Sequence, residues 1–173
     1  MWYNWKKSLS IFLKVNNKKK IKIAIVGTGG IGGLLAILLS NKDNNVVCFN
    51  GKKNGKNLFF LKSNFYGNKK KELKFTTKKI KFFDIVFICV KYQDLKKSIK
   101  SIDNKSNKMI IPLLNGLSHI AVLKKKFKES LFTGNIGKTV SHKENYNSII
   151  HESKNEPVLT ISSENKSRNF EIN

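Results

Sequence analysis

A run of closely spaced glycines near the start of the chain has the clearest capacity for chemistry. It reads Gly27-Thr28-Gly29-Gly30-Ile31-Gly32, with glycine at the first, third and sixth positions. In such a pattern the first glycine permits a tight turn, the second lets a ligand approach the backbone, and the third lets a helix pack closely on a strand. Unpaired N–H groups at the start of that helix attract phosphate. The pattern therefore predicts a pyrophosphate site for a dinucleotide, with a glycine-rich turn that binds no ligand as the alternative.

Such a turn needs a strand before it and a helix after it, and the sequence supplies both. A short apolar run, 21–26, precedes Gly27, and an apolar helical segment extends from the turn to Leu39 or Ser40. Strand, glycine turn and helix form the opening of a βαβ unit. The chain is therefore predicted to have an α/β fold with a Rossmann-type, doubly wound and mostly parallel sheet.

Further apolar runs alternate with helical patterns along the chain, as a parallel sheet requires. Segment 58–75 is interrupted by Gly67 and a lysine run, and it predicts a hairpin at the flank of the sheet. The near-continuous apolar run 85–90 predicts a parallel strand that is covered on both faces. The other predicted elements are strands at 46–49, 109–113, 148–151 and 158–161, and helices at 94–102 and 119–127.

The end of the second predicted strand carries information about the dinucleotide. Rossmann domains that prefer NAD usually place a carboxylate about 20 residues after the glycines, where it holds the ribose hydroxyls. This chain has Asn50-Gly51 at that place, followed by Lys52 and Lys53. Positive charge there suits the 2′-phosphate of NADP(H), although lysine is so common in the chain that coincidence is the alternative. NADP(H) is therefore the predicted cofactor, with Lys52 as a contact.

The length and the charge of the chain limit the other possibilities. With 173 residues there is room for one domain of ordinary size. We expect an N-terminal extension of uncertain order at 1–20, the dinucleotide-binding domain at 21–165, and the start of a connection at 166–173. The net charge of +23 suggests a polyanionic partner, but Arg168 is the only arginine among 34 basic residues. Because readers of nucleic acid rely on arginine, no specific nucleic-acid partner is expected.

Cysteines and histidines show no pattern of a metal or disulfide site. Cys48 and Cys89 each lie inside an apolar run and are predicted to be buried free thiols. His119, His142 and His151 have no metal-ligand spacing and are interpreted as structural. The chain has no stretch of 18 consecutive apolar residues, so no membrane span is expected. These features fit a reducing cytoplasm.

Three separated stretches resemble the N-terminal domain of the ketopantoate reductase (2-dehydropantoate 2-reductase) family. They are the opening 21–32, the strand Asp84-Ile85-Val86-Phe87-Ile88-Cys89-Val90-Lys91 followed by Gln93-Asp94, and the turn Leu113-Leu114-Asn115-Gly116-Leu117. Segments 134–140 and 149–151 are similar to the closing strands of that domain. The resemblance covers about residues 21–164, so it includes nearly the whole predicted domain.

The resemblance implies roles for two further residues. Lys91 is expected near the nicotinamide end of the cofactor, and Asn115 is expected to contact cofactor and substrate together. There is an alternative for each residue. Lys91 is then an ordinary exposed lysine among many, and Asn115 is present because an Asn-Gly pair favours the backbone conformation of a turn. The full set expected to bind the cofactor is Gly27, Thr28, Gly29, Gly30, Ile31, Gly32, Lys52, Lys91 and Asn115.

Two departures from the family are visible in the sequence. The family commonly has an arginine for the 2′-phosphate where this chain has Gly51, so Lys52 has to act as a point charge. The resemblance also implies a second, helical domain that supplies the general-acid lysine, a glutamate, most substrate contacts and much of a homodimer interface. The printed chain ends at Asn173, where that domain is expected to begin. We therefore expect a truncated chain, and no catalytic residue is assigned within it.

The function implied by the resemblance is the NADPH-dependent reduction of 2-dehydropantoate to (R)-pantoate in pantothenate biosynthesis. The partner is then a small 2-oxo acid, and a homodimer is expected only through the second domain. Two alternatives remain open. One is a reductase of another small oxo acid in the same superfamily, and the other is a catalytically silent remnant that binds nucleotides or polyanions.

Overall fold

A computed structural model describes residues 20–52, 54–137 and 139–162. The extension expected at 1–20, apart from Lys20, lies outside the described residues, as do Lys53 and the connection expected at 166–173. Strands and helices alternate along the chain. The strands are β1 (Ile21–Val26), β2 (Asn44–Phe49), β3 (Gly55–Ser63), β4 (Lys69–Thr76), β5 (Ile85–Ile88), β6 (Met109–Pro112), β7 (Thr133–Gly137), β8 (Ser141–Lys143), β9 (Ser148–His151) and β10 (Val158–Ser162). The helices are α2 (Gly30–Leu39), α3 (Tyr92–Ile99) and α4 (Ser118–Phe127), with a short 3-10 turn η1 (Lys128–Ser130).

Eight of these strands form one sheet in the order β6-β5-β1-β2-β4-β3-β9-β8. The five strands from β6 to β4 are parallel to one another. The strand β3 is antiparallel to β4 and parallel to β9, while β8 is antiparallel to β9. The strands β7 and β10 pair with each other in a separate antiparallel sheet. The predicted α/β fold with a mostly parallel sheet is confirmed.

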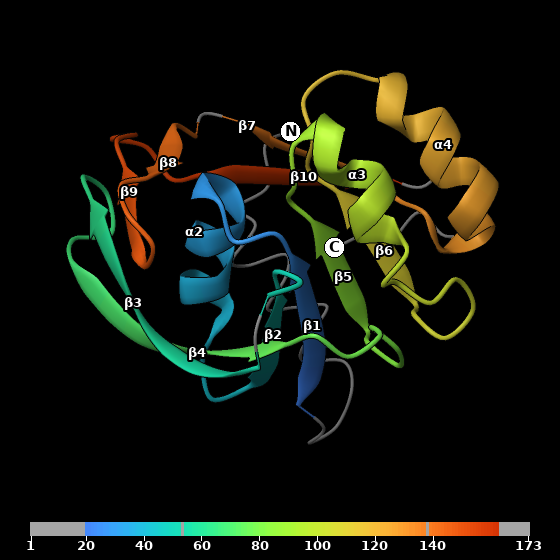
Figure 1. Cartoon of the computed structure of the whole chain (residues 1–173). Helices are drawn as coiled ribbons and strands as arrows, with labels where there is room; N and C mark the ends of the chain where they lie inside the picture. The colour runs from blue at the N-terminus through green and yellow to red at the C-terminus, as the bar shows by residue number, and fades with distance from the viewer. Residues whose placement is uncertain (1–19, 53, 138, 163–173) are drawn as a thin grey trace.

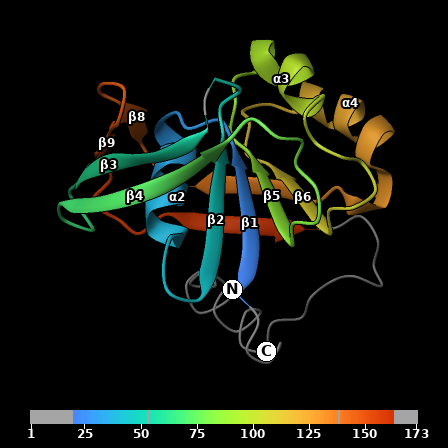
Figure 2. The same ribbon diagram turned by 60° about the horizontal axis from the view of Figure 1, so that its bottom comes forward.

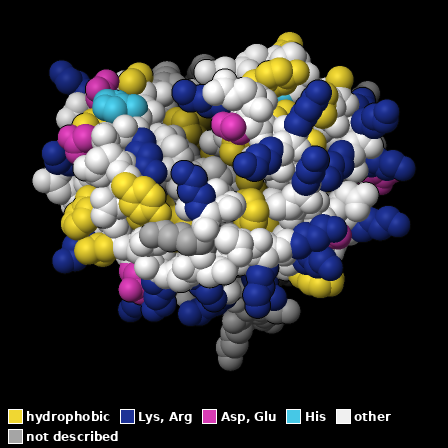
Figure 3. Space-filling view, viewed as in Figure 1, with side chains coloured by type: hydrophobic (Ala, Val, Ile, Leu, Met, Phe, Trp, Pro, Cys, Tyr) yellow, Lys and Arg dark blue, Asp and Glu magenta, His cyan; other side chains and the backbone are white. Residues whose placement is uncertain are grey.

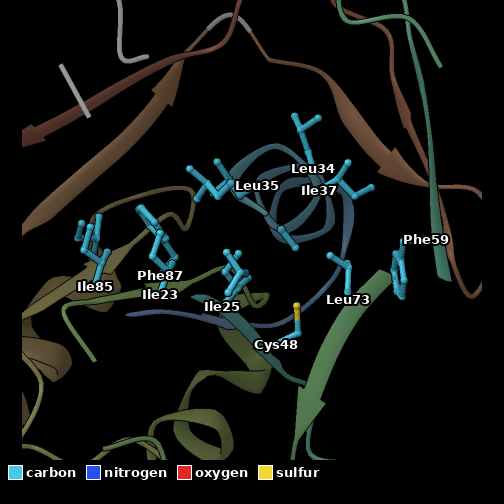
Figure 4. Close-up of a cluster of buried hydrophobic side chains, with 14 of the residues drawn as sticks. Ile23, Ile25, Leu34, Leu35, Ile37, Cys48, Phe59, Leu73, Ile85 and Phe87 are labelled. Atoms are coloured by element: carbon cyan, nitrogen blue, oxygen red, sulfur yellow. The ribbon is translucent and has the colours of Figure 1, made fainter. Parts of the chain in front are cut away.

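Helices cover both faces of the parallel part of the sheet (Figures 1 and 2). Successive side chains of β1 point to opposite faces, so Ile23 and Ile25 lie in the core beneath α2, while Ala24 and Val26 lie in the core beneath α3 and α4. Figure 4 shows Ile23, Ile25 and Phe87 lying beneath α2 in the first core. Because both faces are covered, β5 is buried throughout its length and β1 is buried from Ile23 to Val26, and these stretches are apolar in sequence.

The outer part of the sheet curves around α2, so that β8 and β9 lie beside this helix (Figure 1). A β-carbon added at Gly33 in α2 would lie 2.5 Å from Cδ1 of Ile149 in β9. The hydroxyl of Ser141 in β8 donates a hydrogen bond to the Gly30 carbonyl at 3.1 Å. The closing strands are therefore packed directly on the first turn of α2, which follows the glycine run.

Most predicted elements are present, with differences at their ends. The hairpin predicted within 58–75 is β3 and β4, and the late strands at 148–151 and 158–161 correspond to β9 and β10. The strand predicted to extend to Val90 ends at Ile88, because the chain turns there to begin α3 at Tyr92. The helix predicted at 94–102 is displaced toward the N-terminus and ends at Ile99, since Ile102 forms a bridge with Ile80 instead.

Both cysteines are free thiols. Cys48 is a buried free thiol, as predicted, whereas Cys89 is a free thiol that is only partly buried as a residue. Burial raises the pKa of Cys48 to about 12 and raises that of Cys89 as well, so neither is a thiolate at neutral pH. In the described part of the chain, no cluster of three His, Cys, Asp or Glu side chains could hold a metal ion. Likewise, none of its helices is long and apolar enough to cross a membrane.

Candidate dinucleotide site

The carboxyl ends of four neighbouring strands lie level with one another, because their registers pair their last residues. Val26 of β1 pairs with Phe49 of β2 on one side and with Ile88 of β5 on the other, and Ile88 pairs with Pro112 of β6. Figure 2 shows these four strands side by side. In open α/β sheets, ligands bind outside the carboxyl ends of the strands. The loops that follow these four residues therefore define the edge where a ligand is expected.

Each of these loops carries predicted site residues. Lys52 follows β2, the glycine turn follows β1, Lys91 follows β5 and Asn115 follows β6. The strand order places them along one edge as Asn115, Lys91, glycine turn and Lys52. Neighbouring strands are about 4.8 Å apart, so the set spans the width of the central sheet. The side chains of Lys52, Lys91 and Asn115 are all exposed. The structure thus brings all the predicted residues to the same edge, and their binding roles stay predictions.

The first glycine makes the turn out of β1. Gly27 has a φ of +91°, a conformation that residues with a β-carbon rarely adopt. Its N–H donates to the Phe49 carbonyl at 2.9 Å, which ties the turn to β2. A β-carbon at this position would lie 2.7 Å from Cγ1 of Val90 and 2.9 Å from the Cys89 carbonyl oxygen. The turn therefore requires glycine for both its backbone and its surroundings.

The second glycine faces open space, whereas the last faces the backbone. Gly29 is the N-cap of α2, and an added β-carbon there would meet nothing within 4 Å. A β-carbon at Gly32 would overlap the Gly27 carbonyl oxygen and lie 3.0 Å from Cβ of Cys89. These are the surroundings expected if a ligand approaches Gly29 and if Gly32 lets α2 pack closely on β1.

The N-terminus of α2 has chemistry suited to an anion. No side chain caps it, and its first turn carries no acidic residue. The first N–H that bonds within the helix is that of Gly33, which donates to the Gly29 carbonyl at 2.8 Å. The N–H groups before it point out of the helix end, where the helix dipole also favours negative charge. Of the two other residues in the run, Thr28 is buried and Ile31 packs partly against the core.

The loop after β2 is held in a compact turn. The Asn50 side chain accepts a hydrogen bond from the Lys52 N–H at 3.0 Å, and Gly51 between them has a φ of +69°. An asparagine side chain commonly closes a turn in this way. The position where the family commonly has an arginine is therefore in a left-handed conformation that favours glycine. Among the described residues of this loop, Lys52 is the one cation, and its side chain is exposed.

Lys91 and Asn115 each lie at a turn into a helix. Lys91 is the N-cap of α3, and its carbonyl accepts a hydrogen bond from the Asp94 N–H at 3.0 Å. Asn115 precedes Gly116, whose φ of +79° gives the Asn-Gly turn that the sequence predicts. The Leu113 N–H still donates to the Ile88 carbonyl at 2.9 Å, so the two turns start from adjacent backbone.

One contact of the glycine run was not foreseen from the sequence. A β-carbon at Gly30 would overlap the carbonyl oxygen of Ser141, and the Ser141 hydroxyl donates both to Gly30 and, at 3.0 Å, to the Ile150 carbonyl. Ser141 thereby fixes β8 against the start of α2. Ser141 and Gly30 are 111 positions apart in the chain, which explains why no local pattern indicates this contact.

The sheet order, the helices on both faces and the glycine turn after β1 define a Rossmann-type α/β domain. The family model of ketopantoate reductase PanE/ApbA matches residues 23–162. The chain therefore belongs to this family, and the resemblance stated from the sequence is confirmed.

Solved structures with this fold include the probable 2-dehydropantoate 2-reductase PanE from Bacillus subtilis, D-mandelate dehydrogenase with NADH and anilino(oxo)acetate, and a PanE/ApbA family ketopantoate reductase from Ralstonia eutropha. Their sequence identities to this chain are 21%, 23% and 15%, and their TM-scores are 0.63, 0.64 and 0.65. The matches cover 76%, 82% and 80% of this chain but 46%, 48% and 49% of those chains. The chain thus spans about half the length of the solved structures it matches. A search of curated proteins found no match.

Proposed function

We propose that this chain is the NADPH-binding part of an oxidoreductase that reduces 2-dehydropantoate to (R)-pantoate. The observation that carries the proposal is the order of Asn115, Lys91, the glycine turn and Lys52 along one edge of the sheet. Family membership supports the reaction class. The presence of NADH in the similar D-mandelate dehydrogenase structure supports a nicotinamide cofactor.

The residues of this chain fit such a cofactor. The open space at Gly29 and the uncapped start of α2 suit the pyrophosphate, which the N–H groups of the first turn would hold. Lys91 and Asn115, at the ends of β5 and β6, would lie toward the nicotinamide and the keto acid. The Asn115 amide can donate one hydrogen bond and accept another, so it can orient cofactor and substrate together without adding charge. When bound, NADPH supplies the hydride.

The proposed cofactor preference gives a direct prediction. The described residues of the loop after β2 include no carboxylate that would repel a 2′-phosphate, and Lys52 can pair with one. A charge-assisted hydrogen bond is worth about 1.5–3 kcal/mol, so we expect NADPH to bind about 10-fold or more tightly than NADH. The Lys52→Glu substitution should abolish this difference, as measured by fluorescence titration with both nucleotides. Equal affinities of the unmodified chain for NADPH and NADH would contradict the preference.

The reaction itself is tested by adding substrate. We expect a protein made of these 173 residues to bind NADPH but not to reduce 2-dehydropantoate, because the resemblance assigns the general-acid lysine to a second, helical domain. Adding that domain from a family member as a separate protein should produce 2-dehydropantoate-dependent oxidation of NADPH, followed as loss of the reduced nicotinamide absorbance. The Lys91→Ala variant is the control. Oxidation by the 173-residue chain alone, well above this control, would show that the general acid lies within it.

One of the similar solved structures favours a second candidate substrate class. D-mandelate dehydrogenase, with a TM-score of 0.64, is as similar in fold as the ketopantoate reductases. A reductase of a larger 2-oxo acid is therefore the alternative. The complemented assay is therefore run twice, with the second domain of a ketopantoate reductase and with that of D-mandelate dehydrogenase, and each time with 2-dehydropantoate and an aryl 2-oxo acid. A substrate preference that is the same with both added domains comes from this chain. NADPH binding without turnover of either would instead favour a silent nucleotide-binding remnant.

A further inference from the structure

The strand β8 carries a lysine to the same region as the glycine turn. Lys143 pairs with Ile149 of β9, whose side chain packs on Gly33 in the first turn of α2. Side chains two residues apart on a strand point to the same face, so Lys143 shares the face of Ser141, which bonds to Gly30. The Lys143 side chain therefore extends from β8 on the side that faces the start of α2.

Aromatic rings hold the Lys143 side chain in place. Its Nζ lies 5.0 Å from the centre of the Tyr146 ring and 5.9 Å from the centre of the Phe59 ring. Ammonium groups at such distances are attracted to the faces of aromatic rings. Although the residue is exposed, its charged end is thus directed by contacts rather than left free to sample the solvent.

Lys143 and Lys52 are close enough to repel each other. Burial lowers the pKa of Lys143, and the nearby Tyr146 raises it in part, while the positive charge of Lys52 lowers it further. No described carboxylate forms an ion pair with either lysine. Figure 3 shows that lysines are distributed over most of the visible face of the protein. Lys143 differs from a typical surface lysine in its aromatic contacts and in the repulsion by the charge of Lys52.

From this juxtaposition, and resting on the proposed function, we propose that Lys143 is a second cation for the adenosine 2′-phosphate of NADPH, acting together with Lys52. Lys143 is the last residue of β8, which runs in the same direction as β2, so both lysines lie toward the carboxyl edge of the sheet where that phosphate is expected. A 2′-phosphate near neutral pH carries more than one negative charge, so it can pair with both ammonium groups and relieve their repulsion. Two lysines would then do what the family's single arginine commonly does, since Gly51 cannot.

The test measures Kd values of the full chain for NADPH and NADH by fluorescence titration. The variants are Lys143→Gln, Lys143→Arg and Lys52→Gln, the Lys52/Lys143 double Gln variant, and Lys125→Gln as a matched control on α4, an exposed lysine on the opposite face of the sheet. We expect Lys143→Gln to weaken NADPH binding about 10-fold and to change NADH binding less than about 2-fold. Lys143→Arg should keep the affinity for NADPH, and Lys125→Gln should change neither nucleotide.

Competition with adenosine 2′,5′-bisphosphate and with 5′-AMP locates the effect on the ligand. Lys143→Gln should reduce the advantage of the bisphosphate, because only this ligand carries the 2′-phosphate. An unchanged ratio of NADPH to NADH affinity in Lys143→Gln would overturn the inference while leaving the proposed function intact. Equal weakening of both nucleotides would also overturn it, because the contact would then be to another part of the dinucleotide. If the unmodified chain bound neither nucleotide, the proposed function would fail and the inference with it.

Discussion

Replacing Gly29 with aspartate is expected to weaken NADPH binding about 100-fold or more while leaving the fold intact. The Gly29 backbone has a φ of −74° that any residue can adopt, and a side chain there meets nothing within 4 Å. Aspartate is also a favourable N-cap, so α2 should be at least as stable as before. Its carboxylate would, however, occupy the N–H groups proposed for the pyrophosphate and repel that group. The measurements are NADPH titration and thermal unfolding of the same protein.

Two controls separate charge from space at this position. Gly29→Asn introduces a side chain of the same shape without the charge, and it should weaken binding less than aspartate does. Gly29→Ala tests whether any β-carbon is tolerated near the bound phosphate. If Gly29→Asp bound NADPH within about 2-fold of the unmodified chain, the start of α2 could not be the pyrophosphate site.

The Gly32→Ala substitution is expected to lower the free energy of unfolding by about 2–3 kcal/mol, within the range for overpacked cores. Alanine is normally favoured over glycine inside a helix by about 1 kcal/mol. Here the added β-carbon would overlap the Gly27 carbonyl oxygen, which is backbone and cannot rotate away. The helix must then move from β1, and NADPH binding should weaken as well because the phosphate turn is displaced. Urea unfolding of the two proteins measures the difference.

Gly29→Ala serves as the matched control for Gly32→Ala as well, since the same methyl group is added three residues earlier. Since the added methyl group meets open space, we expect Gly29→Ala to lower the free energy of unfolding by no more than about 1 kcal/mol, the cost of alanine at an N-cap. Equal stability of the two alanine variants would show that α2 does not pack on the turn as closely as the structure indicates.

The parts of the fold that local sequence predicts best are those formed by neighbouring residues. The strand 21–26, the glycine turn and α2 are contiguous, and each has its own signal in apolar period or in glycine spacing. The same holds for the hairpin of β3 and β4. The ends of helices and strands are less well predicted. Strand β5 ends at Ile88 and helix α3 ends at Ile99 because of how the chain turns after these residues.

Sheet membership of the late strands could not be read from the sequence. The short apolar segments 148–151 and 158–162 look alike, yet β9 joins the large sheet beside β3 while β10 pairs with β7 in a separate sheet. An apolar run shows that a strand is buried, but it does not show which other strand supplies the hydrogen bonds. His151 illustrates the same point, because its Nδ1 lies 2.8 Å from the hydroxyl of Ser63, 88 residues away.

The type of domain and the glycine turn are predictable from sequence, because a strand, a tight turn and a helix that follow one another leave a local pattern of residue types. The family is predictable as well, because three separated stretches each resemble it. The sequence also indicated Lys52, since this residue follows directly on a predicted strand. The packing of β8 on the start of α2, and the electrostatic influence of Lys52 on Lys143, which is 91 positions away in the chain, come from the tertiary structure. This arrangement depends on how the sheet curves around α2, which is set by packing among distant strands and is not visible in the spacing of neighbouring residues.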